Sequence, residues 1–112
     1  MTDPDLIIVG SGPAGMAAAS IAAKGGARVL VLDEQPRPGG QIYRNIGVNR
    51  DRLGWLGKDY AAGAILVDDL DHPNIRCEFG ATVWRTDPGP TVCWSQNGQS
   101  QVTSAPYLLL AT

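Results

Sequence analysis

The sequence predicts an α/β fold: a parallel β-sheet core with an inserted antiparallel β-meander. Three observations support this fold class. Two unbroken apolar runs, Leu6 to Val9 and Val29 to Leu32, flank a glycine-rich turn and a stretch of small, helix-forming residues. Short β-type segments separated by turn residues occupy 75–104, and a last apolar run follows at 107–111. Buried parallel strands read as continuous apolar runs, and short segments joined by tight turns read as antiparallel hairpins.

Length, charge and hydrophobicity argue against some classes of protein. With 112 residues and a formal net charge of -2, the chain has the size of one domain and lacks the basic excess typical of nucleic-acid binding. Its apolar runs are too short to cross a bilayer. Asp3 and Asp5 precede the first run, the opposite of the positively charged start of a signal peptide. We therefore expect no nucleic-acid partner, no membrane partner and a cytoplasmic location.

The glycine-rich turn is the most informative motif. The first strand, Asp5 to Val9, leads into the GSGPAG sequence at 10–15; a helix from Pro13 to about Lys24 and a strand from Arg28 to Asp33 follow. A GxGxxG motif alone is weak evidence in a chain with 14 glycines. Between a strand and a helix, and about 20 residues before an acid at a strand end, it is typical of a dinucleotide-binding βαβ unit.

Each residue of this motif has a physical role. Gly10 allows a sharp turn out of the strand, Gly12 has no side chain to obstruct a pyrophosphate, and Gly15 lets the helix lie close to the sheet. Pro13 costs little in the first helical turn, where the missing N–H would be unpaired anyway. The Asp33 carboxylate is expected to accept hydrogen bonds from the adenosine ribose. The alternative is a tight turn that binds nothing.

Two longer segments follow the second strand. Residues 34–49 form a Pro- and Gly-rich loop, whose Gly39-Gly40 pair would permit close approach of the backbone to a ligand; an ordinary surface loop is the alternative. Arg50 to Asp71 has apolar residues at three- and four-residue spacing, which predicts a helix within the segment 50–73. Together, 1–49 are expected to hold the dinucleotide motif and its loop.

The C-terminal third is expected to be β-structure. Short β runs at 75–79, 81–86, 91–95 and 101–104 predict a β-meander over 74–105, and Asn97-Gly98 is a typical hairpin turn. The run at 107–111 predicts a strand that returns to the core within 106–112. We expect 1–112 to form a single, partial domain.

The remaining polar residues suggest no catalytic or metal site. Cys77 and Cys93 do not form a CxxC motif, and their spacing favours free thiols on strands over a redox pair. The single histidine, His72, precedes a proline in a turn. We assign no catalytic residue and no metal ligand, so any chemistry would come from a bound cofactor.

The element order distinguishes FAD from NAD. An inserted β-meander before a final strand resembles the FAD-binding domain of the glutathione-reductase-like flavoproteins with two dinucleotide-binding domains. In that family the final strand carries an Ala-Thr-Gly motif, and 108–112 match the strand and its first two letters. The resemblance implies a Rossmann-like FAD/NAD(P)-binding domain, apparently truncated, with FAD as the cofactor and NAD less favoured.

A closer resemblance is carried by VLDEQP at 31–36 and PGGQIYR at 38–44. These segments resemble the α (A) subunits of bacterial opine oxidases, of hydroxyproline and proline dehydrogenases, and of hydrogen cyanide synthase; sarcosine oxidase α subunits are more distant. The resemblance covers essentially all of this chain but only the N-terminal quarter or so of such proteins. In the family, the loop that contains Gly39, Gly40 and Gln41 runs along the FAD pyrophosphate and ribityl region.

The motif and the resemblance together give a set of cofactor-binding residues: Gly10, Gly12, Pro13, Ala14, Gly15, Asp33, Glu34, Gln35, Gly39, Gly40, Gln41, Val83 and Thr112.

Three functions remain open at this point. The chain could be the FAD-binding part of a flavin-dependent oxidoreductase that oxidises an amino acid or opine at a C–N bond, and alone it would not be catalytically competent. It could be a stand-alone module that binds FAD or NAD. It could also be an empty structural fragment that associates with itself through exposed apolar surface. In the first case its partners would be further C-terminal domains or a β subunit.

Overall fold

The computed structural model describes residues 3–36 and 65–112. These residues form one long helix and seven strands: β1 (Leu6–Val9), α1 (Pro13–Lys24), β2 (Val29–Asp33), β3 (Ile75–Phe79), β4 (Thr82–Asp87), β5 (Thr91–Gln96), β6 (Gln99–Ser104) and β7 (Tyr107–Leu110). A short helical segment at 65–69 precedes β3. Within the described ranges, no helix has the length and apolar character needed to span a membrane.

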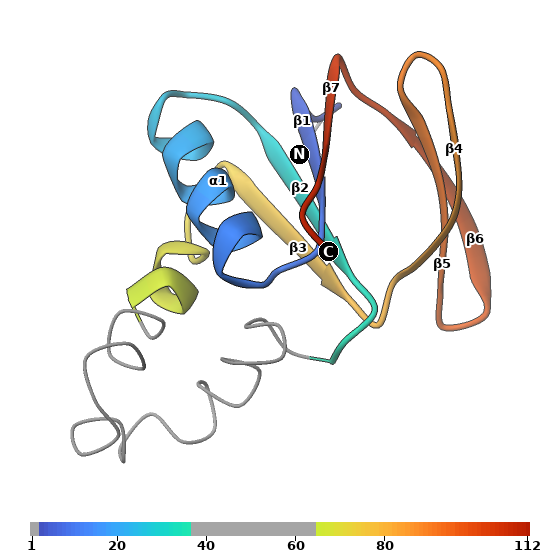
Figure 1. Cartoon of the computed structure of the whole chain (residues 1–112), viewed down its shortest axis with the longest axis horizontal. Coiled ribbons are helices and arrows are strands. Elements are labelled where there is room, and N and C mark those ends of the chain that lie inside the picture. The colour runs from blue at the N-terminus through green and yellow to red at the C-terminus, as the bar shows by residue number, and fades with distance from the viewer. Residues whose placement is uncertain (1–2, 37–64) are drawn as a thin grey trace.

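The strands form two sheets (Figure 1). The first is parallel, with strand order β3-β2-β1-β7, and the second is antiparallel, with order β4-β5-β6. In the parallel sheet, Ile7 of β1 lies opposite Leu30 of β2 on one side and Leu108 of β7 on the other. The C-terminal strand therefore lies beside the N-terminal strand, and the predicted parallel core with an antiparallel insertion is confirmed.

The core consists of two layers of side chains, one on each face of the parallel sheet. Ile7, Leu30 and Leu32 face the antiparallel sheet and pack with Val92 and Trp94. The alternate strand residues point to the other face. There the packed side chains come from β1, β2, α1 and the residue that follows the 65–69 segment: Ile8, Val29, Val31, Met16, Ala19, Ala23 and Leu70. Because successive strand residues alternate between faces, a sheet covered on both sides needs an unbroken apolar strand. All five residues of β2 are buried, as its sequence predicts.

Helix α1 has the predicted limits. It starts at Pro13 and ends at Lys24, and Gly25 follows as its C-cap. The small residues on its buried face, Gly15, Ala19, Ser20 and Ala23, allow close packing on the sheet. The second predicted helix, over 50–71, lies largely outside the described residues. Its described part ends at residue 69, two residues earlier than predicted.

The predicted meander over 74–105 requires one correction. β3, the first strand of that predicted meander, belongs to the parallel sheet and pairs with β2, Val29 lying opposite Ile75. The antiparallel sheet begins only at Thr82. The reason lies in the connection from β2 to β3. Leu70, near the end of this connection, packs in the same layer as α1, so the chain returns on the α1 face of the sheet and enters β3 parallel to β2.

The remaining strands follow the predicted hairpins. Asn97 and Gly98 have φ angles of 53° and 78°, and Gln96 lies opposite Gln99, so the Asn-Gly pair forms the two-residue turn between β5 and β6. Primed turns need positive φ at both central residues, which explains this residue pair.

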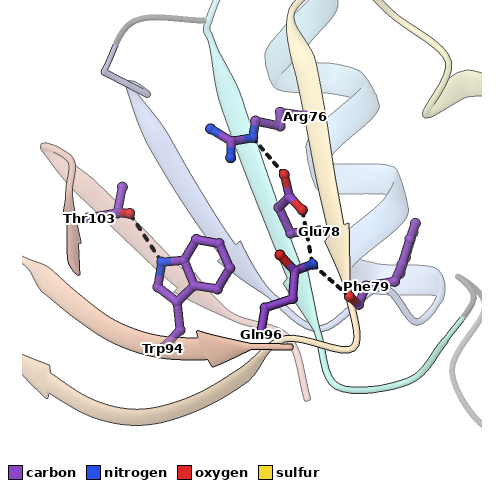
Figure 2. A network of polar contacts seen from close by, with 6 residues as sticks. All are labelled: Arg76, Glu78, Phe79, Trp94, Gln96 and Thr103. Carbon is purple, nitrogen blue, oxygen red and sulfur yellow. Dashed lines mark hydrogen bonds and ion pairs between the residues drawn. The ribbon is translucent and has the colours of Figure 1, made fainter. Parts of the chain in front are cut away.

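A polar network joins the two sheets (Figure 2). The side-chain amide of Gln96 on β5 donates to Glu78 Oε2 at 3.0 Å and to the Phe79 carbonyl at 2.9 Å, both on β3. Arg76 donates to the other Glu78 oxygen at 2.8 Å. This network connects β5 of the antiparallel sheet to β3 of the parallel sheet.

Candidate functional site

The glycine turn lies at the carboxyl end of β1. Gly10 has a φ of +107°, and its N–H donates to the Leu32 carbonyl of β2 at 2.8 Å. A Cβ at Gly10 would lie 2.7 Å from the Ala111 carbonyl oxygen, and a Cβ at Gly15 would overlap with the Gly10 carbonyl oxygen. The turn is thus packed against both the chain after β7 and the first turn of α1. The conformational role predicted for Gly10 and the packing role predicted for Gly15 are both present.

The N-terminus of α1 opens directly from this turn. Gly12 is the N-cap and makes no side-chain capping bond; its carbonyl accepts the first helical bond from Met16 N–H at 2.9 Å. The first N–H groups of a helix lack intrahelical partners, and the helix dipole places partial positive charge there. The start of α1 is therefore suited to bind an anion in front of Gly12.

A pocket of about 700 Å³ lies in front of this helix end. Its walls come from the carboxyl ends of β1, β2 and β7, from the first turn of α1, and from Ala81 and Val83 at the start of the antiparallel sheet. Ligands of open α/β sheets bind at the carboxyl ends of the strands. The volume lies within the range of small-molecule and cofactor sites.

Asp33 links the glycine turn to the end of β2. It is 8% exposed, and its Oδ2 accepts hydrogen bonds from the Ser11 N–H at 2.7 Å and the Ser11 hydroxyl at 2.6 Å. Its Oδ1 accepts a third bond from the Gln35 N–H at 2.8 Å. Charge-assisted bonds of this kind are stronger than neutral ones, so they hold the turn and the 33–35 segment in a fixed relation.

The structure brings most of the predicted site residues together. Nine of them line the pocket: Gly10, Gly12, Pro13, Ala14, Asp33, Glu34, Gln35, Val83 and Thr112. Gly15 is buried behind the turn. Gly39, Gly40 and Gln41 lie outside the described residues. Whether these residues bind a cofactor stays a prediction.

Sequence reasoning missed five residues of the pocket wall: Val9, Ser11, Leu32, Ala81 and Ala111. Val9 and Leu32 end the two apolar runs, so the position of the motif could have suggested them. Ser11 occupies a variable position of the motif, so the motif does not mark it. Its hydroxyl in the turn and the acid at the end of the next strand could still have suggested that Ser11 pairs with Asp33. No local sequence feature marks Ala81 or Ala111. Ala81 reaches the pocket through the position of the antiparallel sheet, and Ala111 through the position of β7.

Both cysteines are free thiols, as predicted, and neither lines the pocket. Cys77 lies on β3, where burial and the neighbouring Glu78 charge raise the pKa of its thiol to about 11. Cys93 is buried on β5. A neutral thiol is a poor nucleophile, so Cys77 is unsuited to redox or nucleophilic chemistry near neutral pH. Among the described residues, no group of three or more His, Cys, Asp or Glu side chains could hold a metal ion.

The residues present fit a dinucleotide. The turn approaches its neighbours so closely that a Cβ at Gly10 has no room, the N-terminus of α1 has no side-chain cap, and two acids stand at the end of β2. A pyrophosphate would face the N–H groups of the first helical turn, and the hydroxyls of a ribose would lie toward the acids.

The comparisons with known proteins agree with this geometry. Residues 8–93 match the family model described as "NAD(P)-binding Rossmann-like domain". The chain is 54% identical to the opine oxidase A-type subunit of Agrobacterium tumefaciens (strain Ach5) over 81 residues, which cover 71% of this chain and 16% of that protein. It is 44% identical to the opine oxidase A-type subunit of Rhizobium meliloti over an alignment of 117 positions, which covers 96% of this chain and 22% of that protein.

A solved structure shares the fold. The L-proline dehydrogenase from P. horikoshii superposes with a TM-score of 0.76 at 20% identity, over 99% of this chain and 22% of that chain. The chain thus spans 16% to 22% of the length of these three proteins.

Proposed function

Since the chain belongs to the NAD(P)-binding Rossmann-like domain family, we propose that it binds the adenosine and pyrophosphate part of FAD within a flavin-dependent oxidoreductase. The observation that carries this proposal is the α1 N-terminus, which opens into a pocket between the ends of β1, β2 and β7 and has no side-chain cap. Asp33 and Glu34 line the same pocket, and we propose that the adenosine ribose lies toward them. Val83 and Thr112 also line it.

The choice of FAD over NAD rests on the inserted antiparallel sheet and on the relatives. In the resembling flavoproteins a β-meander precedes the last core strand, and here β4, β5 and β6 precede β7. The relatives named as opine oxidase subunits support the oxidation of an opine or amino acid at a C–N bond. FAD, when bound, would accept the hydride in that reaction. This chain would bind and orient the adenine-nucleotide half of the cofactor through Gly12, Pro13 and Ala14.

We propose that the complete activity needs further protein. We assign no catalytic role to any described residue, and the chain spans only 16% and 22% of the two opine oxidase subunits reported above. Those relatives are named as subunits, which supports partners in a larger assembly. A binding module without turnover is the second candidate. A turnover assay on this chain together with the further domains and subunits it is proposed to need, with an artificial electron acceptor, separates the two, because only the oxidoreductase would consume substrate.

The direct test is FAD retention. We expect the purified chain, mixed with FAD and desalted, to keep flavin absorbance bands. Gly12→Val should abolish retention without unfolding the chain, because Gly12 has an ordinary φ of -69° that valine can adopt, while its side chain would project toward the phosphates.

Gly25→Val is the matched control. Gly25 also has a negative φ, -81°, but it lies at the other end of α1, so retention should be unchanged. A folded, colourless wild-type chain would contradict the FAD site, and equal retention by Gly12→Val would contradict the placement of the pyrophosphate.

A further inference from the structure

We propose a division of labour between the two adjacent acids, an inference that rests on the proposed function. Asp33 is a positioning residue that holds the pyrophosphate-binding turn through Ser11. Glu34 is the acid that accepts hydrogen bonds from the adenosine ribose. This assignment differs from the expectation drawn from the motif, in which Asp33 contacts the ribose directly.

The Asp33 carboxylate is already largely occupied. A carboxylate offers about four lone-pair sites. Three are used by the Ser11 N–H, the Ser11 hydroxyl and the Gln35 N–H, all at 2.8 Å or less. A ribose presents two hydroxyls side by side, and the single remaining site of a side chain that is 8% exposed cannot accept from both.

The bonds of Asp33 instead determine the shape of the turn. Ser11 is completely buried and lies between Gly10 and Gly12; its N–H bond to Asp33 orients the Gly10–Ser11 peptide group, and its hydroxyl bond holds its side chain to the same carboxylate oxygen. Gly12 is the N-cap of α1. Asp33 therefore acts on the phosphate-binding N–H groups indirectly. It holds Ser11, and Ser11 leads directly into Gly12 and the start of α1.

Glu34 has the accessibility that Asp33 lacks. It is exposed, lines the same pocket, and has no hydrogen-bond or ion-pair partner within the part of the chain that the structure describes. Its backbone is nevertheless held on both sides, because Ala81 N–H donates to the Asp33 carbonyl at 2.9 Å and Gly80 N–H donates to the Gln35 carbonyl at 3.0 Å. An accessible carboxylate on a fixed backbone at the pocket rim is suited to bind a diol.

Three probes distinguish the two roles: ADP, 2′-deoxy-ADP and adenosine, titrated into the full chain by calorimetry. For the wild type we expect ADP to bind roughly tenfold tighter than 2′-deoxy-ADP, the effect of one charge-assisted hydrogen bond. Glu34→Ala should bring this ratio close to one. Asp33→Asn should leave the ratio unchanged and reduce the preference for ADP over adenosine, because only the phosphate-binding turn is disturbed.

Ser11→Ala is the second variant for the positioning role, and keeps that role testable if Asp33→Asn does not fold. It should also lower the preference for ADP over adenosine and leave the preference over 2′-deoxy-ADP intact. The inference is overturned if Asp33→Asn, and not Glu34→Ala, removes discrimination against 2′-deoxy-ADP. It is also overturned if neither Asp33→Asn nor Ser11→Ala alters the ratio of ADP to adenosine affinity.

The outcome of the wild-type titration separates this inference from the proposed function. A wild-type chain that binds neither ADP nor FAD contradicts the proposed function, and the ribose assignment falls with it. A wild-type chain that binds ADP, with Glu34→Ala retaining the full preference over 2′-deoxy-ADP, contradicts only the assignment of Glu34.

Discussion

Gly10 shows how a single residue fixes the site geometry. Its φ of +107° is a conformation that other residues rarely adopt, and its missing Cβ leaves room for the Ala111 carbonyl. The N–H of the same residue bonds to β2. One glycine thus brings three strand ends together at the pocket, and both its conformation and its size are needed.

A pair of variants separates these two requirements. Gly26 has a similar φ of +97°, but a Cβ there meets nothing within 4 Å. Gly26→Ala should lower the free energy of unfolding by about 1–2 kcal/mol, the cost of the backbone conformation alone. Gly10→Ala should cost about 3 kcal/mol or more, because the Ala111 backbone must also move. Urea unfolding measures both; equal losses would show that the contact with Ala111 is easily relieved.

The link between β3 and β5 matters at the scale of the element. β3 is an edge strand of the parallel sheet, and Glu78 joins it to the antiparallel sheet through Gln96 (Figure 2). Partial burial raises the pKa of Glu78, but hydrogen bonds from Arg76 and Gln96 and the Arg76 charge outweigh it, so the pKa lies below the ordinary 4.5. The ionised form of Glu78 is therefore favoured by folding.

This shift gives a pH-dependent prediction. A lowered pKa in the folded state means that the stabilisation is complete above pH 4.5 and is lost as the pH falls through the lower, folded value. Glu78→Gln should lower the free energy of unfolding by about 1 kcal/mol at pH 7, and the difference from the wild type should shrink steadily below pH 4.5. Urea unfolding at several pH values provides the measurement.

The exposed pair Arg85–Asp87 on β4 is the control for this variant. Its atoms are 3.0 Å apart, but both side chains are more than a third exposed. Exposed ion pairs contribute little to stability, so Asp87→Asn should change stability by less than about 0.5 kcal/mol at any of these pH values. If the loss of unfolding free energy in Glu78→Gln did not change with pH, the contribution of Glu78 would come from packing and not from its charge.

At the scale of the whole molecule, β7 leaves apolar side chains uncovered. β7 is an edge strand of the parallel sheet (Figure 1). On it, Tyr107 and Leu110 are 71% and 62% exposed. An exposed apolar edge strand favours pairing with another chain or segment. This surface supports the proposal that the chain functions within a larger assembly.

We expect the chain alone to self-associate through β7 as its concentration rises. Tyr107→Lys should shift the population toward monomer, because lysine on an edge strand opposes strand pairing. Ile21→Lys is the matched control: Ile21 is 75% exposed, but on α1, so it should leave association unchanged. Sedimentation velocity over a range of concentrations measures the effect. A strictly monomeric wild type, or equal effects of both variants, would contradict association through β7.

Local sequence patterns predict most of the individual elements and the position of the candidate site. The GxGxxG order places Gly10 and Gly15, the small residues of α1 predict its limits, and the unbroken apolar run of β2 predicts burial on both faces. Asn97-Gly98 predicts its turn. These features depend on backbone conformation and on the alternation of side chains, which neighbouring residues control.

The three-dimensional structure was needed to show which distant groups meet. It placed β3 in the parallel sheet, because strand partners depend on how the crossover packs and not on the strand's own residues. It paired Asp33 with Ser11, 22 residues apart in sequence, and so left Glu34 as the accessible acid. A sequence motif identifies the types of residue that gather at a strand end. The hydrogen bonds available there, which depend on long-range packing, determine the contacts that each carboxylate makes.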